Sequence, residues 1–117
     1  GRKTVQVCTR RKIVEIINLD DNTFDQSTSD GVTLVDFYAD WCGPCKRMLP
    51  VLESVSETLS SENVSVAKVN VDHSPKTSAR FGVRTIPMFA LIKDGQLVGK
   101  LVGSKPAGEL LAFATST

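Results

Sequence analysis

The chain has 117 residues, the usual size of one domain. Hydrophobic residues make up 41% of it and charged residues 23%, a balance that excludes a disordered chain, a collagen-like repeat and a disulfide-dense secreted scaffold. No apolar stretch approaches the ~20 residues that a membrane-spanning helix needs. The basic start is followed by Glu15 in place of an apolar segment, so we expect no signal peptide.

The net charge of +1 is unevenly distributed. Five of the 14 basic residues lie in the first twelve positions, which hold no acidic residue, and this leaves 9 basic against 13 acidic side chains elsewhere. A mildly acidic domain does not offer the basic patch that nucleic-acid binding requires. We therefore expect a flexible basic leader over residues 1–12 and a single domain over 13–117. An arm attracted to phosphate or membranes, or the remainder of a processed targeting segment, is the alternative for the leader.

Short apolar runs alternate with amphipathic segments, which is typical of an α/β fold. Apolar and β-branched runs predict strands at 13–17, 32–39, 64–71, 87–92 and 96–102. Helical spacing and capping residues predict helices at 23–27, 42–60, 75–80 and 105–114, with Pro50 expected to kink the longest. Asp94-Gly95 predicts an antiparallel hairpin. We expect a central mixed five-stranded sheet flanked by four helices.

Cys42 and Cys45 lie where a predicted central strand passes into the longest predicted helix. Residues three apart on a helix are about 5–6 Å apart between Cβ atoms, so a small adjustment in the first turn joins the two sulfurs. The helix start favours a thiolate at Cys42, and we expect Cys45, one turn further in, to be less exposed. A ring this small gains only about 2 kcal/mol from loop entropy, so redox exchange explains the spacing better than a structural crosslink.

A zinc site is the main alternative, because C-x-x-C is also half of a typical zinc site. The remaining ligands would have to be Cys8 in the leader and His73 on a predicted loop. Pro44 and the preceding strand suit a strand-to-helix turn better than a zinc knuckle. We therefore expect no metal and no bound cofactor.

The segment Trp41-Cys42-Gly43-Pro44-Cys45-Lys46 resembles the active-site motif of the thioredoxin family. The likeness continues in order through residues 35–37, 67–72, 81–87 and 102–103, and covers about residues 13–114. It implies the thioredoxin fold and a thiol–disulfide oxidoreductase that reduces protein disulfides through a mixed disulfide. Tyr38 stands at an aromatic position that varies within the family, and Met88 stands where threonine is common.

The resemblance implies roles for individual residues. Cys42 corresponds to the nucleophile and Cys45 to the resolving cysteine, and the two form the redox-active disulfide. Asp36 corresponds to a buried acid that accepts and returns the Cys45 proton, with Lys68 modulating its charge; a solvent-exposed carboxylate at a strand edge is the alternative. The substrate-binding surface would comprise Trp41, Gly43, Pro44, Val71, Ile86, Pro87 and Gly103. The Ile86-Pro87 bond would be cis, and ordinary packing is the alternative for Val71.

The resemblance also implies partners. These are a thioredoxin reductase that recharges the cysteine pair and disulfide-containing substrates such as peroxiredoxins or ribonucleotide reductase, with no nucleic acid and no membrane. We expect a cytoplasmic monomer, with a processed organellar form as the alternative. A secreted oxidase or isomerase is a second interpretation, although such relatives usually carry histidine where this chain has Pro44. A non-catalytic subunit that clamps a partner is a third.

Overall fold

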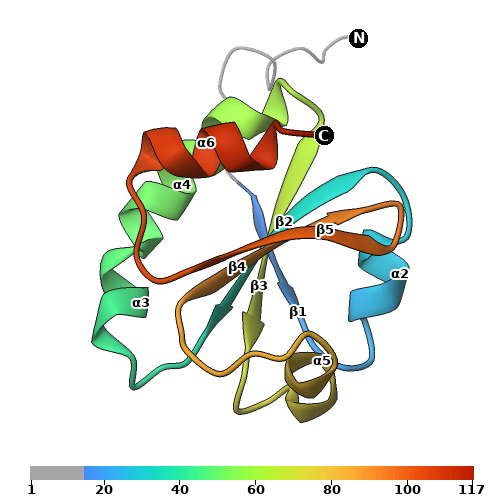
Figure 1. The fold of residues 1–117 in the computed structure, drawn as a ribbon, viewed down its shortest axis with the longest axis vertical. Coiled ribbons are helices and arrows are strands. Elements are labelled where there is room, and N and C mark those ends of the chain that lie inside the picture. The colour runs from blue at the N-terminus through green and yellow to red at the C-terminus, as the bar shows by residue number, and fades with distance from the viewer. Residues whose placement is uncertain (1–14) are drawn as a thin grey trace, which may run out of the picture.

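The computed structural model describes residues 15–117. The expected leader and the first two residues of the expected first strand lie outside this range. Five strands form a mixed sheet in the order β1-β3-β2-β4-β5 (Figure 1). The strands are β1 (Ile16–Leu19), β2 (Val32–Tyr38), β3 (Val64–Asn70), β4 (Met88–Lys93) and β5 (Gln96–Val102). The helices are α2 (Phe24–Thr28), α3 (Gly43–Arg47), α4 (Leu49–Ser60), α5 (Pro75–Arg80) and α6 (Ala107–Ala114).

The strand directions follow the predicted mixed topology. Strands β1, β3 and β2 are parallel, whereas β4 runs antiparallel to both β2 and β5. The turn between β4 and β5 places Asp94 and Gly95 at φ of 50° and 84°, the left-handed conformations that a two-residue hairpin requires. The Asp94 carboxylate accepts a hydrogen bond of 2.8 Å from the Gly31 amide, which fixes the hairpin against the start of β2.

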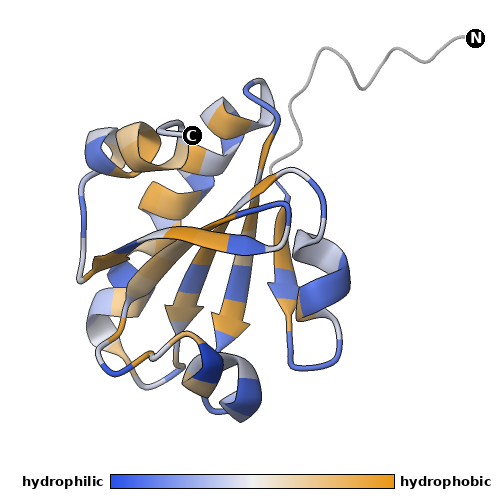
Figure 2. Ribbon diagram, turned by 45° about the vertical axis from the view of Figure 1, so that its right-hand side comes forward, coloured by the Kyte–Doolittle hydropathy of each residue, from blue (hydrophilic) through white to orange (hydrophobic). Residues whose placement is uncertain are grey.

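Helices cover both faces of the sheet. Helices α4 and α6 pack on one face, where Leu34, Val66 and Phe89 are buried. Phe24 of α2 and Phe81, next to α5, pack on the other face. Successive side chains of a strand point to opposite faces. Strand β2 therefore contributes Leu34 to the core under α4 and α6, and Val35 to the core under α2 and α5. Figure 2 shows hydrophobic residues along the central strands and hydrophilic stretches on α2 and α5.

The predicted helix over 42–60 is two helices, so the described residues form five helices where four were expected. The break lies at Met48, whose amide bonds to the carbonyls of both Pro44 and Cys45 in a tightened turn. Pro50 has no N–H to donate to the Lys46 carbonyl, but it suits the first turn of a new helix. The expected kink is therefore a full break.

Other boundaries differ by a few residues. The first strand extends to Leu19, beyond the predicted end at residue 17, because backbone pairing with β3 continues through the polar Asn18. Strand β4 begins after Pro87, which cannot donate to a ladder, and α6 begins after Pro106, which is extended. These shifts leave the predicted order of elements intact.

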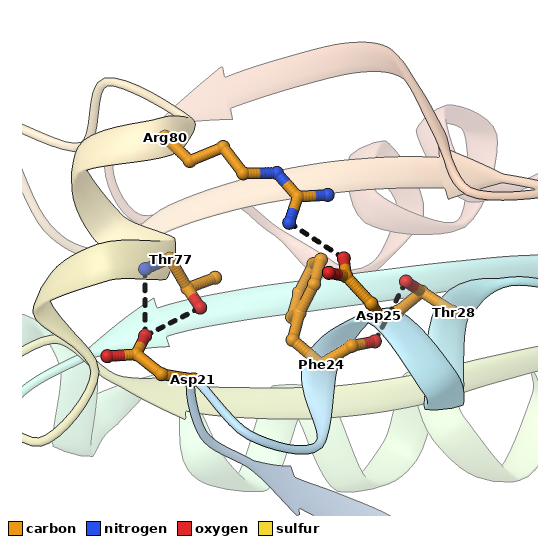
Figure 3. A network of polar contacts seen from close by, with 6 residues as sticks. All are labelled: Asp21, Phe24, Asp25, Thr28, Thr77 and Arg80. Carbon is orange, nitrogen blue, oxygen red and sulfur yellow. Dashed lines mark hydrogen bonds and ion pairs between the residues drawn. The ribbon is translucent and has the colours of Figure 1, made fainter.

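A polar cluster joins α2 to α5 (Figure 3). The Asp21 carboxylate accepts hydrogen bonds from the Thr77 amide at 2.8 Å, the Thr77 hydroxyl at 2.7 Å and the Lys76 amide at 3.2 Å. It thereby caps the start of α5 from a distant part of the sequence. Arg80 forms an ion pair of 2.7 Å with Asp25. These contacts fix α5, which the segment leading to Ile86 and Pro87 follows in the chain.

We expect Asp21→Ala to lower the melting temperature, because it leaves the amides at the start of α5 without their acceptor. Desolvation pushes the pKa of Asp21 upward, but the hydrogen bonds from Thr77 and Lys76 outweigh it and leave the pKa lowered. The part of the native chain's advantage over the variant that depends on ionisation is full above the unfolded pKa of 3.8 and is lost as pH falls through the lowered folded pKa. Thermal unfolding from pH 2 to 7 tests this, with Asp21→Asn as the acceptor-retaining control. Equal melting temperatures at pH 7 for the native chain and Asp21→Ala would contradict it.

Candidate active site

The predicted cysteine pair lies at the start of α3, directly after the carboxyl end of β2. Cys42 is the N-cap residue of α3, with extended backbone, and its sulfur accepts a hydrogen bond of 3.2 Å from the Cys45 amide. Cys42 and Cys45 are joined by a disulfide bond with 5.3 Å between their Cα atoms. The strand-to-helix turn therefore brings the two sulfurs together as the spacing predicted.

Both cysteines are buried, and their exposed fractions, 4% for Cys42 and 3% for Cys45, hardly differ. Cys45 is thus the less exposed of the two, as expected, although the difference in the disulfide form is small. A cis peptide bond joins Ile86 to Pro87, as the resemblance implied, and the Ile86 carbonyl oxygen lies 4.0 Å from the Cys42 sulfur. Val71 and Ile86 pack partly buried against the two cysteines.

The other residues expected at the binding surface surround this cluster. Trp41 is 69% exposed, and its indole N–H donates a hydrogen bond of 2.9 Å to the Asp72 carboxylate. The Gly103 amide donates one of 2.8 Å to the Pro87 carbonyl, so the residue after β5 is tied to the cis-proline loop. Pro44 is exposed and Gly43 is partly exposed. The sequence did not predict this contact of Asp72, since no local pattern links it to Trp41.

Asp36 lies at the centre of the sheet and is 1% exposed, so the alternative of a solvent-exposed carboxylate is wrong. In the backbone register of the sheet, Asp36 lies opposite Lys68 on β3 and opposite Phe89 on β4. Its Oδ1 atom has no hydrogen-bond partner among the described residues. Burial raises the pKa of Asp36 to about 7, although the charge of Lys68 acts in the opposite direction. Burial therefore moves the titration of Asp36 toward neutral pH.

Lys68 and Cys45 line a common hollow of about 410 Å³ together with Tyr38, Ala39, Asp40, Lys46 and Leu49. The Lys68 ammonium lies 4.7 Å from the centroid of the Tyr38 ring. Burial raises the pKa of Tyr38, and the charges of Asp40 and Asp36 add to this effect while the Asn70 side chain opposes it. The phenol therefore stays neutral through the range in which Asp36 titrates.

The alternative of a zinc site finds no ligand set in residues 15–117. No group of three or more histidine, cysteine or acidic side chains within that range could hold a metal ion. His73 lies exposed between β3 and α5, and Cys8 is outside the described residues. Within the same range, no helix is long and apolar enough to cross a membrane.

Comparisons with known proteins agree with this geometry. The thioredoxin family model matches residues 15–116. The thioredoxin of Listeria monocytogenes is 44% identical over 90 residues, which are 77% of this chain and 86% of that protein. The thioredoxin of Bacillus subtilis is 41% identical over 91 residues, covering 78% of this chain and 86% of that one.

Solved structures show the same likeness. A thioredoxin variant from Halobacterium salinarum superposes with a TM-score of 0.79 at 34% identity, covering 87% of this chain and 89% of its own. A thioredoxin from Malassezia sympodialis gives a TM-score of 0.80 at 33% identity, and the match covers 90% of this chain and 92% of that one. The motif, the fold, the cysteine geometry and these relatives lead to one conclusion: the chain belongs to the thioredoxin family of thiol–disulfide oxidoreductases.

Proposed function

We propose that this chain reduces disulfide bonds in substrate proteins, with Cys42 as the nucleophile and Cys45 as the resolving cysteine. The observation that carries the proposal is the disulfide-bonded pair at the start of α3, beside the cis Ile86-Pro87 bond, in a member of the thioredoxin family. Such a pair accepts two electrons when it is reduced and gives them up when its sulfurs join again.

The first step is attack by the Cys42 thiolate on one sulfur of the substrate disulfide. The position of Cys42 at the N-cap favours the thiolate, because the Cys45 amide donates to its sulfur and the positive end of the helix dipole lies beside it. A bond forms between Cys42 and the substrate as the substrate S–S bond breaks. The departing substrate sulfur takes up a proton and leaves as a thiol.

The second step resolves the mixed disulfide. Cys45 gives its proton to Asp36, and its sulfur then attacks the Cys42 sulfur. The bond from Cys42 to the substrate breaks, and the second substrate sulfur leaves as a thiolate, which then takes up a proton. The substrate has gained two electrons, and the Cys42–Cys45 disulfide has formed. A pKa of about 7 suits Asp36 to both accepting and returning a proton at neutral pH.

Substrate binding belongs to the exposed surface around Cys42. The Ile86 carbonyl, close to the Cys42 sulfur, offers an acceptor to the backbone of an extended substrate segment. The remaining contacts would come from Trp41, Gly43, Pro44, Val71, Pro87 and Gly103. Val71 also packs against both the cysteine cluster and the core on the α2 and α5 side, so packing accounts for part of its role.

The family implies in general a reductase that recharges the pair and disulfide-containing substrate proteins. Within the proposal, the recharging partner is a thioredoxin reductase, and peroxiredoxins or ribonucleotide reductase are suitable substrates. The protein acts as a cytoplasmic monomer, and the domain over residues 13–117 carries every residue of the mechanism. It needs no bound cofactor, because the cysteine pair itself carries the electrons.

We expect Cys42→Ser to reduce the rate of insulin disulfide reduction by dithiothreitol to the rate measured without the protein. The reason is that a serine hydroxyl at this position cannot form the mixed disulfide. Cys8→Ser is the matched control and should retain nearly full activity, because Cys8 takes no part in the mechanism. Equal losses in the two variants would place the leader in the mechanism and contradict the assignment.

Cys45→Ser should trap substrate proteins as mixed disulfides with Cys42, because the resolving sulfur is absent. The trapped complexes should appear on non-reducing gels and dissociate with dithiothreitol. This variant also tests the interpretation as a non-catalytic clamp, in which partners bind equally well to Cys42→Ser/Cys45→Ser. Partners retained in that double variant, with no disulfide-linked species in the single one, would favour the clamp.

We expect Asp36→Ala to be more stable than the native chain at pH 8 and to gain less at pH 4. Because burial raises the folded pKa above the unfolded one, the native chain loses stability from pH 3.8 upward until the folded group ionises near pH 7. That shift corresponds to a pH-dependent cost of at most about 4 kcal/mol. Denaturant unfolding of the oxidised protein from pH 4 to 8 measures it, with Asp36→Asn as the control of similar size.

The same variant should slow the resolution step, because Cys45 loses its proton acceptor. The decay of a mixed disulfide with a chromogenic thiol, followed by stopped flow, measures this step directly. A variant that is less stable at pH 8 and resolves the mixed disulfide at the native rate would make Asp36 a structural residue.

A further inference from the structure

Tyr38, Lys68 and Asp36 lie on the same face of the sheet. Lys68 on β3 is in direct register with Asp36 on β2, and Tyr38 is two residues further along β2. Since side chains alternate between faces with a period of two, all three share the face that also carries Leu34. Lys68 therefore has two neighbours on this face that attract a cation, the carboxyl of Asp36 directly opposite and the ring of Tyr38 diagonally across.

The ammonium lies on the ring. Its nitrogen is 4.7 Å from the centroid of Tyr38, within the ~6 Å at which a cation is attracted to an aromatic face. In the described part of the chain, Lys68 makes no ion pair with Asp36, and Asp36 Oδ1 has no hydrogen-bond partner. Lys68 is thus opposite Asp36 in the sheet, but its ammonium lies over the ring of Tyr38.

We propose that Tyr38 is a positioning residue whose ring holds the Lys68 ammonium out of contact with the Asp36 carboxyl. The proposal rests on the proposed function, in which Asp36 takes the proton of Cys45. A direct ion pair would favour the carboxylate and lower the pKa of an aspartate by about 1–3 units. Asp36 would then be a weaker base at neutral pH and a poorer acceptor for a thiol proton.

Other charged groups border this arrangement. Asp40, after β2, and Lys46, on α3, line the hollow that contains Cys45. Asp20 and His73 line a second hollow of about 230 Å³ that Tyr38 and Lys68 also border. Phe89, which faces Asp36 from β4, carries no charge. Because these groups are the same in every variant below, they do not account for a difference between variants.

The direct test is the titration of the Asp36 carboxyl carbon by NMR in the oxidised protein. In that form Cys42 and Cys45 are disulfide-bonded and do not titrate, so the measurement is independent of turnover. Tyr38→Leu removes the ring, and we expect the pKa of Asp36 to fall by about 1 unit or more. Tyr38→Phe keeps the ring and should titrate as the native chain does. Tyr38→Thr, a second ring-free residue suited to a strand, should repeat the fall.

Lys68→Gln, alone and combined with Tyr38→Leu, completes a double-mutant cycle. If the ring acts through Lys68, the pKa of Asp36 in Lys68→Gln should be the same with and without Tyr38→Leu. A pKa that stays unchanged or rises in Tyr38→Leu would overturn the proposal, as would a fall of equal size in the absence of Lys68. If the pKa behaves as expected but Asp36→Ala resolves mixed disulfides normally, the proposed catalytic role of Asp36 fails while the positioning by Tyr38 stands.

Discussion

The burial of one carboxyl group in the central strand is the constraint on which the active site depends. Strand β2 is paired on both edges and covered by helices on both faces, so only 1% of Asp36 is exposed. An ionised carboxylate is costly in such a place, and its pKa rises instead. The same strand ends at the turn that presents Cys42. Strand β2 therefore carries Asp36, the proposed proton acceptor, and leads directly to Cys42, the proposed nucleophile.

The helix break at Met48 lets one segment serve two purposes. Helix α4 is fixed by Leu52, Val55 and Leu59, which are fully buried against the sheet. Helix α3 is a short segment of five residues that carries the cysteine pair at its start. Because Pro50 interrupts the hydrogen-bond ladder between them, α3 and α4 are separate helices. The cysteine pair therefore lies in the short helix that begins directly after β2.

The sequence predicted those features that depend on local chemistry. The apolar runs, the Asp94-Gly95 turn and the cysteine spacing each act within a few residues, and the structure agrees with them. The break at Met48 was underestimated, because a proline inside a helical pattern indicates a disturbance but not its extent. Whether Asp36 was buried or exposed depended on strand order, which joins segments that are far apart in the chain.

The sequence pattern did not predict contacts between segments that are far apart in the chain. The hydrogen bond from Trp41 to Asp72 joins residues 31 positions apart, and the Asp21 cap reaches α5 across 55 or more. The position of the Lys68 ammonium is a further case, because register alone brings Lys68 beside Asp36, whereas in the structure its ammonium lies over the ring of Tyr38. Which of two attractive neighbours a long side chain contacts depends on the three-dimensional packing around it, which the residue pattern does not show.

The different roles proposed for the two cysteines do not follow from their exposure, since both are almost equally buried. They follow from position within one helical turn. The sulfur of Cys42, at the N-cap, accepts the Cys45 amide, so a negative charge there is stabilised by a backbone donor. Cys45 lies one turn further in, beside the hollow that Lys68 and Tyr38 border. In the proposed mechanism its proton passes to Asp36. The proposed activation of Cys42 by a backbone hydrogen bond and the proposed activation of Cys45 by a buried acid therefore involve different groups, and the turn that follows β2 places the two cysteines within one helical turn.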